Sequence, residues 1–244
     1  MTWRTALKTG LAALLATAGI AAAQNEADIT GAGASFPAPL IATWADLYRD
    51  VTGGAVVVNY QSIGSGGGIS NFIEQTIHFG ATEAFLNDEQ LAAARGATGG
   101  EAYNLPVTLA DVVVTYNVPG VDSGLVLTGN VIARIFLGEI NQWNDAALQE
   151  LNPGVSLPLL PISVVHRADG SGTTDVFTNY LTTICEDWAQ IVGRGTSVNW
   201  PTGIGARGNA GVAGNIAQTP YSLGYVEKAF AGLNDLPFAA MQNQ

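Results

Sequence analysis

Arg167, Ser171 and Thr173 lie close together in the stretch ISVVHRADGSGTTDVFTNYL (162–181), and their types suit the binding of an anion. The apolar run at the start of this stretch predicts a strand, and apolar residues at spacings of three and four further on predict a helix. A strand, a Gly/Ser/Thr turn and a helix in this order aim unpaired backbone N–H groups and the positive end of the helix at one point. With a guanidinium beside them, these groups can hold a negatively charged ligand.

Ser35 and Ser65 occupy two similar turns, each ahead of an amphipathic helix. Ser35 ends GAGAS (31–35), a flexible turn, and stands where the N-cap of the following helix is expected. Ser65 lies in QSIGSGGG (61–68), between a predicted strand and a predicted helix. Turns at the carboxyl ends of strands in open α/β sheets line one crevice, so the three turns can surround a single anion. The alternative is that each serine only caps its own helix.

Enzymes are the rival class for such a cluster of hydroxyls. The sequence has neither a G-x-S-x-G elbow nor a Walker A lysine motif. His78 and His166 lack metal-ligand spacing, and we expect both to be structural and no metal to be bound. His166 adjoins Arg167 on the predicted strand, where neighbouring side chains point to opposite faces, so His166 should face away from a ligand of Arg167. We therefore predict no catalysis, with a secreted hydrolase or phosphatase that uses Ser171 as the alternative.

Strands and helices alternate along the chain, which indicates an α/β fold with mostly parallel strands. The patterns predict strands over 55–60, 76–86, part of 105–118, 162–165 and 222–230. They predict helices over 40–51, around 69–73, and over 88–95, 127–137 and 177–184. The run ADVVVTYNV (110–118) is nearly continuously apolar, as in strands buried within a parallel sheet. The glycine-rich segment 203–214 shows no clear element.

The chain has 244 residues, of which 48% are hydrophobic, enough to bury a core in one large domain or two lobes. Residues 1–23 combine a positive start, a short apolar run and small residues at the end, which predicts a signal peptide cleaved after about Ala23. The apolar run is too short for a membrane span. Cys185 is the single cysteine, and we expect it to be a small core residue.

Removing that leader takes away Arg4 and Lys8 but no acidic residue, which leaves 7 basic and 20 acidic residues and a net charge of −13. Such a charge argues against binding to nucleic acid. It does not argue against a small anion, because the Debye length at physiological salt is only about 8 Å. Hydrogen bonds to a charged group contribute roughly 1.5–3 kcal/mol each and act at shorter range, so local donors decide.

Several segments, in order, resemble those of a known family: GAGASFPAP, NYQSIGSGGG, FGATEA, IFLGEINQWND, VVHRADGSGTTDVFTNYL, GNAGVA and LGYVE. From about Ile29 onward the chain is similar to the periplasmic phosphate-binding proteins of high-affinity phosphate ABC transporters. The resemblance implies a type II periplasmic-binding-protein fold, in which two α/β lobes with mostly parallel sheets close over phosphate. It also implies a periplasmic monomer without a cofactor, which delivers phosphate to a membrane permease. Another tetrahedral oxyanion, such as arsenate or sulfate, is the alternative ligand.

The resemblance also implies which groups contact phosphate. From the first turn these would be the Ser35 hydroxyl and the Phe36 N–H, and from the second turn Ser65. Arg167, held by Asp169, would be the one cationic partner. The third turn would add Ser171, the N–H of Gly172, and Thr173.

Two of these positions depart from the family pattern. Ser35 replaces the usual threonine and keeps the hydroxyl. Glu83 replaces the usual aspartate, which accepts the proton of hydrogen phosphate and so excludes sulfate. A glutamate can perform the same task but reaches roughly 1.5 Å further, about one bond length. Glu83→Gln should therefore weaken phosphate binding and reduce the rejection of sulfate, since an unpaired acceptor can discriminate by about 10⁴–10⁵.

The resemblance also suggests a division of the chain. It implies a signal peptide over 1–23, lobe one over 24–111 and lobe two over 112–244. Family members continue further and return to complete lobe one, so we expect lobe one to lack its returning segment. We also expect exposed apolar surface and a lower thermal stability than that of a full-length homologue.

Overall fold

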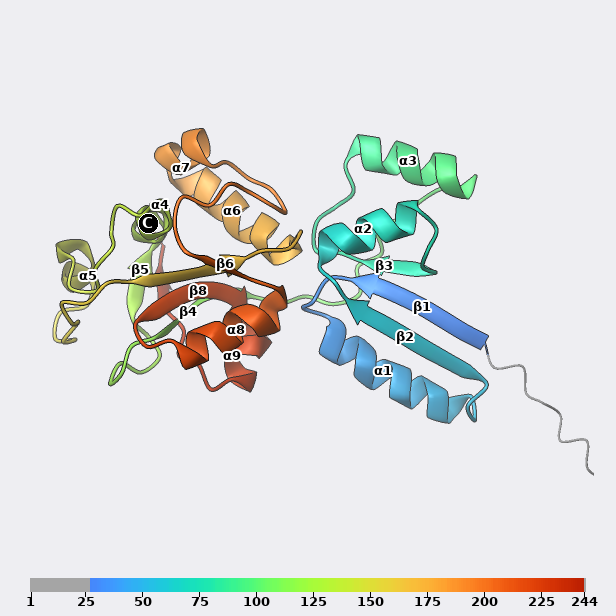
Figure 1. Ribbon diagram of the computed structural model, residues 1–244, viewed down its shortest axis with the longest axis horizontal. Coiled ribbons are helices and arrows are strands. Elements are labelled where there is room, and N and C mark those ends of the chain that lie inside the picture. Colours follow the sequence, from blue (N-terminus) through green and yellow to red (C-terminus); the bar gives the residue numbers. More distant parts are fainter. Residues whose placement is uncertain (1–26, 244) are drawn as a thin grey trace, which may run out of the picture.

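A computed structural model of the chain describes residues 27–243, which form two α/β halves side by side (Figure 1). We refer to residues 27–98 as the N-terminal half and to residues 112–243 as the C-terminal half. The signal peptide predicted over residues 1–23 lies outside the described residues. Within residues 27–243, no helix has both the length and the apolar character needed to cross a membrane.

The N-terminal half contains a three-stranded parallel sheet in the order β2-β1-β3. Its elements are β1 (Ala27–Gly33), α1 (Ala38–Val51), β2 (Val56–Ser62), α2 (Ser65–Ile73), β3 (Phe79–Ala81) and α3 (Asp88–Thr98). Helix α1 lies on one side of the sheet, and α2 and α3 lie on the other (Figure 1). Helix α3 confirms the surface helix predicted from residue 88, and its start is fixed by a capping box between Asn87 and Gln90.

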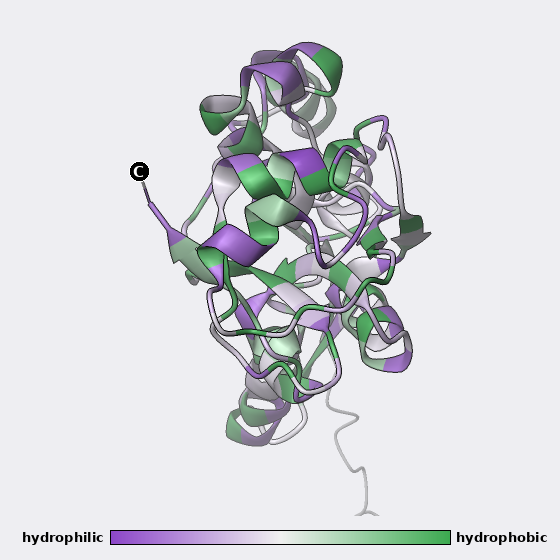
Figure 2. Cartoon of the chain, turned by 90° about the vertical axis from the view of Figure 1, so that its left-hand side faces the viewer, coloured by the Kyte–Doolittle hydropathy of each residue, from purple (hydrophilic) through white to green (hydrophobic). Residues whose placement is uncertain are grey.

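The C-terminal half is built on a four-stranded sheet in the order β4-β8-β6-β7. Its strands are β4 (Val112–Asn117), β6 (Ser163–Arg167), β7 (Ile204–Ala206) and β8 (Ser222–Glu227), with β5 (Val126–Thr128) and β9 (Ala240–Gln242) as a separate parallel pair. Its helices are α4 (Gly129–Leu137), α5 (Ala146–Leu151), α6 (Gly172–Ile184), α7 (Glu186–Ile191), α8 (Gly208–Gln218) and α9 (Lys228–Leu233). Figure 2, which faces this half, shows polar and apolar residues mixed along its helices, as expected for helices with one face on a sheet.

Both faces of this larger sheet are covered by apolar residues. Val164 and Tyr225 belong to the core cluster that includes α4, α6 and α7, whereas Val165 and Val226 belong to the cluster that includes α8 and α9. Successive strand residues point to opposite faces, so each strand contributes to both cores. Cys185 is buried at the edge of the first cluster, which agrees with its prediction as a core residue.

The prediction of mostly parallel strands is confirmed, but two details are wrong. The first concerns β4, which was predicted to lie in a parallel sheet and instead pairs antiparallel with β8. A continuous apolar run reports burial on both faces, and burial does not fix strand direction. The second is that β8 ends at Glu227 and is not the last strand, since α9 and β9 follow it.

The turn predicted over Gly31–Ser35 is also wrong in part, because β1 continues through Gly33 as the central strand. A Cβ on Gly31 would lie within 2.1 Å of the Phe79 ring. Gly31 and Gly33 lack side chains and so let β3 pack closely against β1. The sequence pattern does not show that a neighbouring strand will approach here. Elsewhere, the strand predicted over 76–86 shrinks to β3, residues 126–128 form β5 ahead of α4, and the glycine-rich segment 203–214 forms β7 and most of α8.

Candidate anion-binding site

The carboxyl ends of β1, β2 and β6 point toward the junction between the two halves (Figure 1). Each of these strands is followed by a helix, α1, α2 or α6, whose first turn begins at this junction. Hydrogen bonds connect residues of the two halves here, including one from the Gly66 N–H to the Gly170 carbonyl at 2.9 Å. The structure therefore brings together the three turns that the sequence singled out.

Ser35 lies in the first of these turns and is buried. It does not cap α1 as predicted, because the N-cap is Pro37 and no side chain caps this helix. The Ser35 Oγ instead accepts hydrogen bonds from the backbone N–H and the side-chain Nδ2 of Asn209, at 3.2 and 3.1 Å. Phe36 follows in the same turn, and no acceptor within residues 27–243 takes its N–H.

Ser65 is the first residue of α2 and meets Glu83 from the segment after β3. The Ser65 Oγ lies 3.4 Å from Glu83 Oε2 and accepts from the Glu83 N–H at the same distance. From the other half, the Thr173 hydroxyl donates to Glu83 Oε1 at 2.8 Å. Burial raises the pKa of the Glu83 carboxyl, against the opposing effects of Thr173, Arg167 and Ser65. The longer side chain therefore still reaches the other predicted site residues.

Arg167 and Asp169 form a buried ion pair at the end of β6. Their side chains are 1% and 9% exposed, and two hydrogen bonds of 2.8 and 2.5 Å join Arg167 Nε and Nη2 to the two carboxylate oxygens. The Gly208 N–H also donates to Asp169 at 3.0 Å. Burial alone would raise the pKa of Asp169, but these hydrogen bonds and the Arg167 charge lower it. The remaining Nη1 of Arg167 faces Thr173 Oγ1 at 3.5 Å.

The start of α6 completes the cluster. Ser171 is the N-cap of α6, and its Oγ accepts from the Thr174 N–H at 3.1 Å. Gly172 lies so close to the N-terminal half that a Cβ on it would meet Glu83 Cβ at 2.4 Å and Ser65 Oγ at 2.7 Å. The Gly172 N–H belongs to the first turn of α6, whose N–H groups have no partner within the helix itself, so it can donate to a ligand. Glycine at this position permits the close approach of the two halves.

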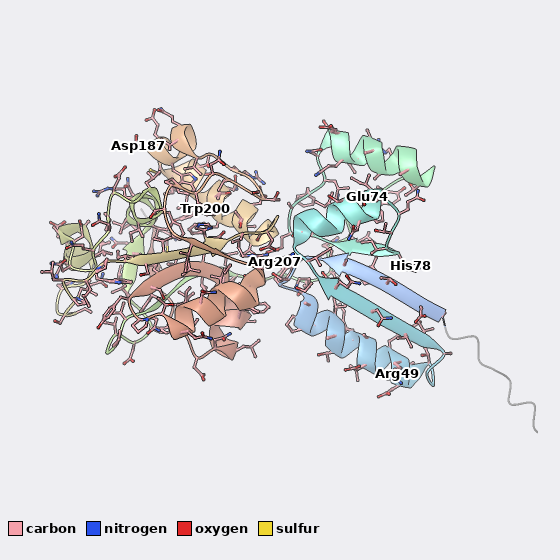
Figure 3. The ribbon with its side chains drawn as sticks, in the orientation of Figure 1. Arg49, Glu74, His78, Asp187, Trp200 and Arg207 are labelled. Carbon is pink, nitrogen blue, oxygen red and sulfur yellow. The ribbon has the colours of Figure 1, made fainter. Side chains whose placement is uncertain are left out.

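The two histidines lie apart from this cluster. The His166 ring stacks on Trp200 with its centroid 4.8 Å away, and its Nδ1 contacts the Arg167 carbonyl at 3.0 Å. Burial lowers the pKa of His166. His78 accepts from the Thr30 N–H and lies on the outer side of the N-terminal half, away from the junction (Figure 3). The structure thus gives His166 partners other than Ser171, the nucleophile of the hydrolase alternative.

Sequence reasoning missed Asn209 and Arg207 at the start of α8. Asn209 is fully buried, and Arg207 lies at the junction (Figure 3), where it lines a cavity of about 330 Å³ together with Ser35 and Asp169. The signal was present in GNAGVA (208–213), since an asparagine precedes apolar residues at helical spacing. Within residues 27–243, no group of three or more His, Cys, Asp or Glu side chains is arranged to hold a metal ion.

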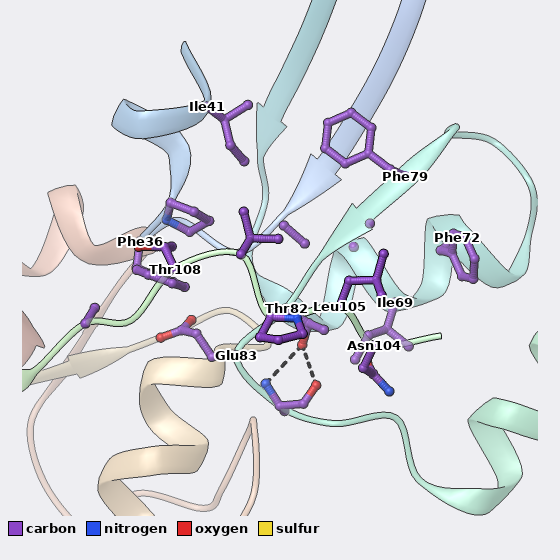
Figure 4. Close-up of a pocket in the computed structure, with 18 of the residues that line it drawn as sticks. Phe36, Ile41, Ile69, Phe72, Phe79, Thr82, Glu83, Asn104, Leu105 and Thr108 are labelled. Carbon is purple, nitrogen blue, oxygen red and sulfur yellow. Dashed lines mark hydrogen bonds between the residues drawn. The ribbon is translucent and has the colours of Figure 1, made fainter. Parts of the chain in front are cut away.

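A larger apolar groove of about 1130 Å³ opens on the N-terminal half. It is lined by α1, β3 and the connecting segment 102–110, and Phe36 and Glu83 stand at its end nearest the cluster (Figure 4). The groove offers few polar groups for an anion. We therefore assign the candidate site to the buried polar cluster at the junction, although the groove is the larger space.

The chain is similar in sequence to proteins named phosphate-binding protein PstS. It is 48% identical to the one from Pasteurella multocida (strain Pm70) over 217 residues, which is 88% of this chain and 61% of that protein. It is also 48% identical over 217 residues to the one from Haemophilus influenzae (strain ATCC 51907 / DSM 11121 / KW20 / Rd), covering 88% of this chain and 63% of that protein. The chain thus spans about three fifths of the length of these relatives.

Solved structures show the same fold. A high affinity periplasmic phosphate-binding protein bound with phosphate, PfluDING, has a TM-score of 0.69 at 23% identity, covering 89% of this chain and 62% of that one. A phosphate binding protein from Stenotrophomonas maltophilia has a TM-score of 0.64 at 22% identity, covering 88% and 64%. A family model described as "PBP superfamily domain" matches residues 18–241. Because this match spans most of the chain, the chain belongs to the PBP superfamily.

Proposed function

We propose that the chain captures inorganic phosphate between its two halves, as the solute-binding protein of a phosphate ABC importer. The single observation that carries this proposal is the convergence of Ser35, Ser65 and Thr173 beside the Arg167–Asp169 pair. The names of its relatives support phosphate as the ligand. Phe36, Glu83, Ser171 and Gly172 belong to the same proposed site.

The charges of the cluster indicate how an anion would be held. Asp169 neutralises most of the Arg167 charge, so Arg167 does not offer a full positive charge to the ligand. The stabilisation must come from hydroxyl donors and from the positive ends of α1, α2 and α6, which begin at the junction. The main-chain N–H groups at these helix starts do not need to be reorganised when the ligand binds. A site of this kind tolerates the acidic net charge of the protein.

Glu83 provides the proposed discrimination between phosphate and sulfate. Its carboxylate is an acceptor among donors, and hydrogen phosphate carries a proton that it can accept, whereas sulfate carries none. An acceptor that faces the ligand without a proton between them would be left buried and unpaired. Selectivity for phosphate therefore follows from the same residue that departs from the family pattern.

The proposal includes the predicted organisation of the chain. Residues 24–111 would form lobe one and residues 112–244 lobe two, a division supported by the separate sheets β2-β1-β3 and β4-β8-β6-β7. The leader, residues 1–23, would be cleaved after about Ala23 and the product exported to the periplasm. It would act as a monomer that passes phosphate to a membrane permease, without catalysis.

Calorimetric titration of the chain with phosphate, arsenate and sulfate tests this function. We expect saturable binding of phosphate and much weaker binding of sulfate. Tighter binding of arsenate or sulfate would favour the alternative oxyanion, and absence of binding to all three would overturn the proposal. A parallel assay with a phosphate ester checks for a hydrolase, since release of product that is lost in Ser171→Ala would contradict a pure binding role.

A further inference from the structure

Asn209 is the buried polar residue that connects most of the candidate site. It lies at the second position of α8 and is fully buried. Its side chain contacts residues from three separated parts of the chain: Ser35 in the N-terminal half, Thr173 at the start of α6, and Glu227 at the end of β8. We propose that Asn209 is a positioning residue that prepares the Ser35 hydroxyl as a donor to the bound anion and directs the Thr173 proton toward Glu83. This inference rests on the proposed function and deepens it.

The Ser35 hydroxyl is the first group that Asn209 orients. A serine hydroxyl has one donor proton and two acceptor sites. The Ser35 Oγ accepts from the Asn209 N–H at 3.2 Å and from Asn209 Nδ2 at 3.1 Å, so both acceptor sites are used. Its proton is then left for another acceptor, and none within residues 27–243 takes it. Ser35 is thereby prepared as a donor, which is the role that binding an anion requires.

Thr173 is oriented by the same amide. Its Oγ1 accepts from Asn209 Nδ2 at 3.3 Å and from Arg167 Nη1 at 3.5 Å, and its own proton goes to Glu83 at 2.8 Å. The two hydrogens of the Asn209 amide thus serve one hydroxyl in each half. Because Thr173 donates to Glu83, the carboxylate keeps its role as the acceptor in the site.

The direction of the Asn209 amide is itself fixed. Its Oδ1 accepts from the Glu227 N–H at 3.0 Å, on the side away from the hydroxyls. A flipped amide would set Nδ2 against this N–H and lose that hydrogen bond, and its Oδ1 would then accept the protons of Ser35 and Thr173 instead of directing them elsewhere. A main-chain group of the central strand β8 therefore determines which atom of Asn209 faces the ligand-binding hydroxyls.

A double-mutant cycle separates this positioning role from a merely structural one. The variants are Asn209→Ala, Ser35→Ala and the double mutant, with phosphate affinity measured by calorimetry and thermal unfolding measured without phosphate. Asn209→Asp is added because it is nearly isosteric and keeps the acceptor for the Glu227 N–H. The matched control is Asn215→Ala on the same helix, since the amide of Asn215 is exposed and, within residues 27–243, donates to the Gly211 carbonyl alone.

We expect Asn209→Ala to weaken phosphate binding by about 10–100-fold, roughly the value of one hydrogen bond to a charged group. Asn209→Asp should weaken it at least as much, because the atom facing the hydroxyls becomes an acceptor. In the Ser35→Ala background the same Asn209→Ala change should cost at least about threefold less, and Asn215→Ala should stay within about twofold of the unaltered chain.

The outcomes distinguish the two proposals. If the unaltered chain binds phosphate but the effects of Asn209→Ala and Ser35→Ala simply multiply, the positioning role is overturned and the proposed function stands. If the unaltered chain binds no phosphate, both are overturned. A role confined to folding predicts a lower unfolding temperature for Asn209→Ala with no coupling in affinity. Should Asn209→Ala fail to fold, Asn209→Asp decides, since full affinity in that variant would contradict the inference.

Discussion

The two halves of the molecule differ in how completely they are packed. In the C-terminal half the sheet β4-β8-β6-β7 has apolar cores on both faces, with Trp143 and Trp188 fully buried. In the N-terminal half α1 buries none of its residues, and Leu47 and Val51 are 58% and 82% exposed. Yet both halves supply fully or nearly fully buried residues to the candidate site. The C-terminal half therefore carries both apolar cores, whereas most of the buried residues of the N-terminal half lie near its junction with the C-terminal half.

We expect the largest effect from removing one partner of the buried Arg167–Asp169 pair in the C-terminal half. Arg167→Ala leaves Asp169 buried without its charge partner, so we expect a loss of about 3–5 kcal/mol in the free energy of unfolding. Phosphate binding should be lost as well. Chemical unfolding and calorimetry measure the two effects. Arg134→Ala is the control, because its pair with Glu139 is about half exposed and should contribute no more than about 1 kcal/mol. Equal losses of unfolding free energy in both variants would contradict a larger contribution from the buried pair.

Two leucines test the difference in packing directly. Leu181 is 0% exposed in the C-terminal half, and Leu47 is 58% exposed on α1. We expect Leu181→Ala to lower the free energy of unfolding by about 2–5 kcal/mol and Leu47→Ala by no more than about 0.5 kcal/mol. Chemical unfolding monitored by circular dichroism gives both values. A large loss for Leu47→Ala would show that α1 is packed in solution and would contradict the difference in packing between the two halves.

Glu83→Gln tests whether the Glu83 carboxylate contacts the anion at the junction of the two halves. It should weaken phosphate binding by about 1.5–3 kcal/mol, the contribution of a hydrogen bond to a charged group, and weaken sulfate binding much less. Titration with both ions, alongside Glu74→Gln outside the site, provides the measurement. Unchanged affinities for both ions would remove Glu83 from the site.

The same variant tests a pH dependence. Burial raises the pKa of Glu83 in the folded chain above its ordinary value of 4.5. The folded state therefore holds this proton more tightly than the unfolded state, and the resulting stability is present below pH 4.5 and lost as the pH rises through the raised pKa. The unfolding free energy of the unaltered chain, minus that of Glu83→Gln, should fall as the pH rises over this range. A difference that does not change with pH would contradict the assignment.

The smallest expected effect concerns the approach of the two halves. A Cβ added in Gly172→Ala would meet Glu83 Cβ at 2.4 Å, so the halves must shift, at a cost of about 1–3 kcal/mol in phosphate binding. Gly214→Ala is the matched control, because its Cβ would meet nothing within 4 Å. Calorimetry should find the affinity of Gly214→Ala unchanged. An equally unchanged affinity for Gly172→Ala would show that the halves need not meet this closely.

How much the sequence could predict differs between the site and the fold. Seven of the predicted site residues, Ser35, Ser65, Glu83, Arg167, Asp169, Gly172 and Thr173, meet in one cluster. Local patterns marked Arg167 and the three turns, whereas Glu83 and Asp169 were predicted from the family resemblance. Asn209 escaped prediction, since its partners are far away in the chain. The direction of β4 and the extent of β1 were not predicted for the same reason. The direction of β4 depends on its pairing with β8, and the extent of β1 depends on its pairing with β3.

Periodicity and local backbone preferences are enough to predict the α/β alternation, most of the strand-to-helix turns and the opposite faces of His166 and Arg167. That the Ser35 hydroxyl binds Asn209 instead of capping α1, and that α1 is the helix with an exposed apolar face, follows only from the packing of the folded chain. A hydroxyl or an apolar face has no preference for one partner until folding brings a partner within reach. For Ser35 that partner lies 174 residues away.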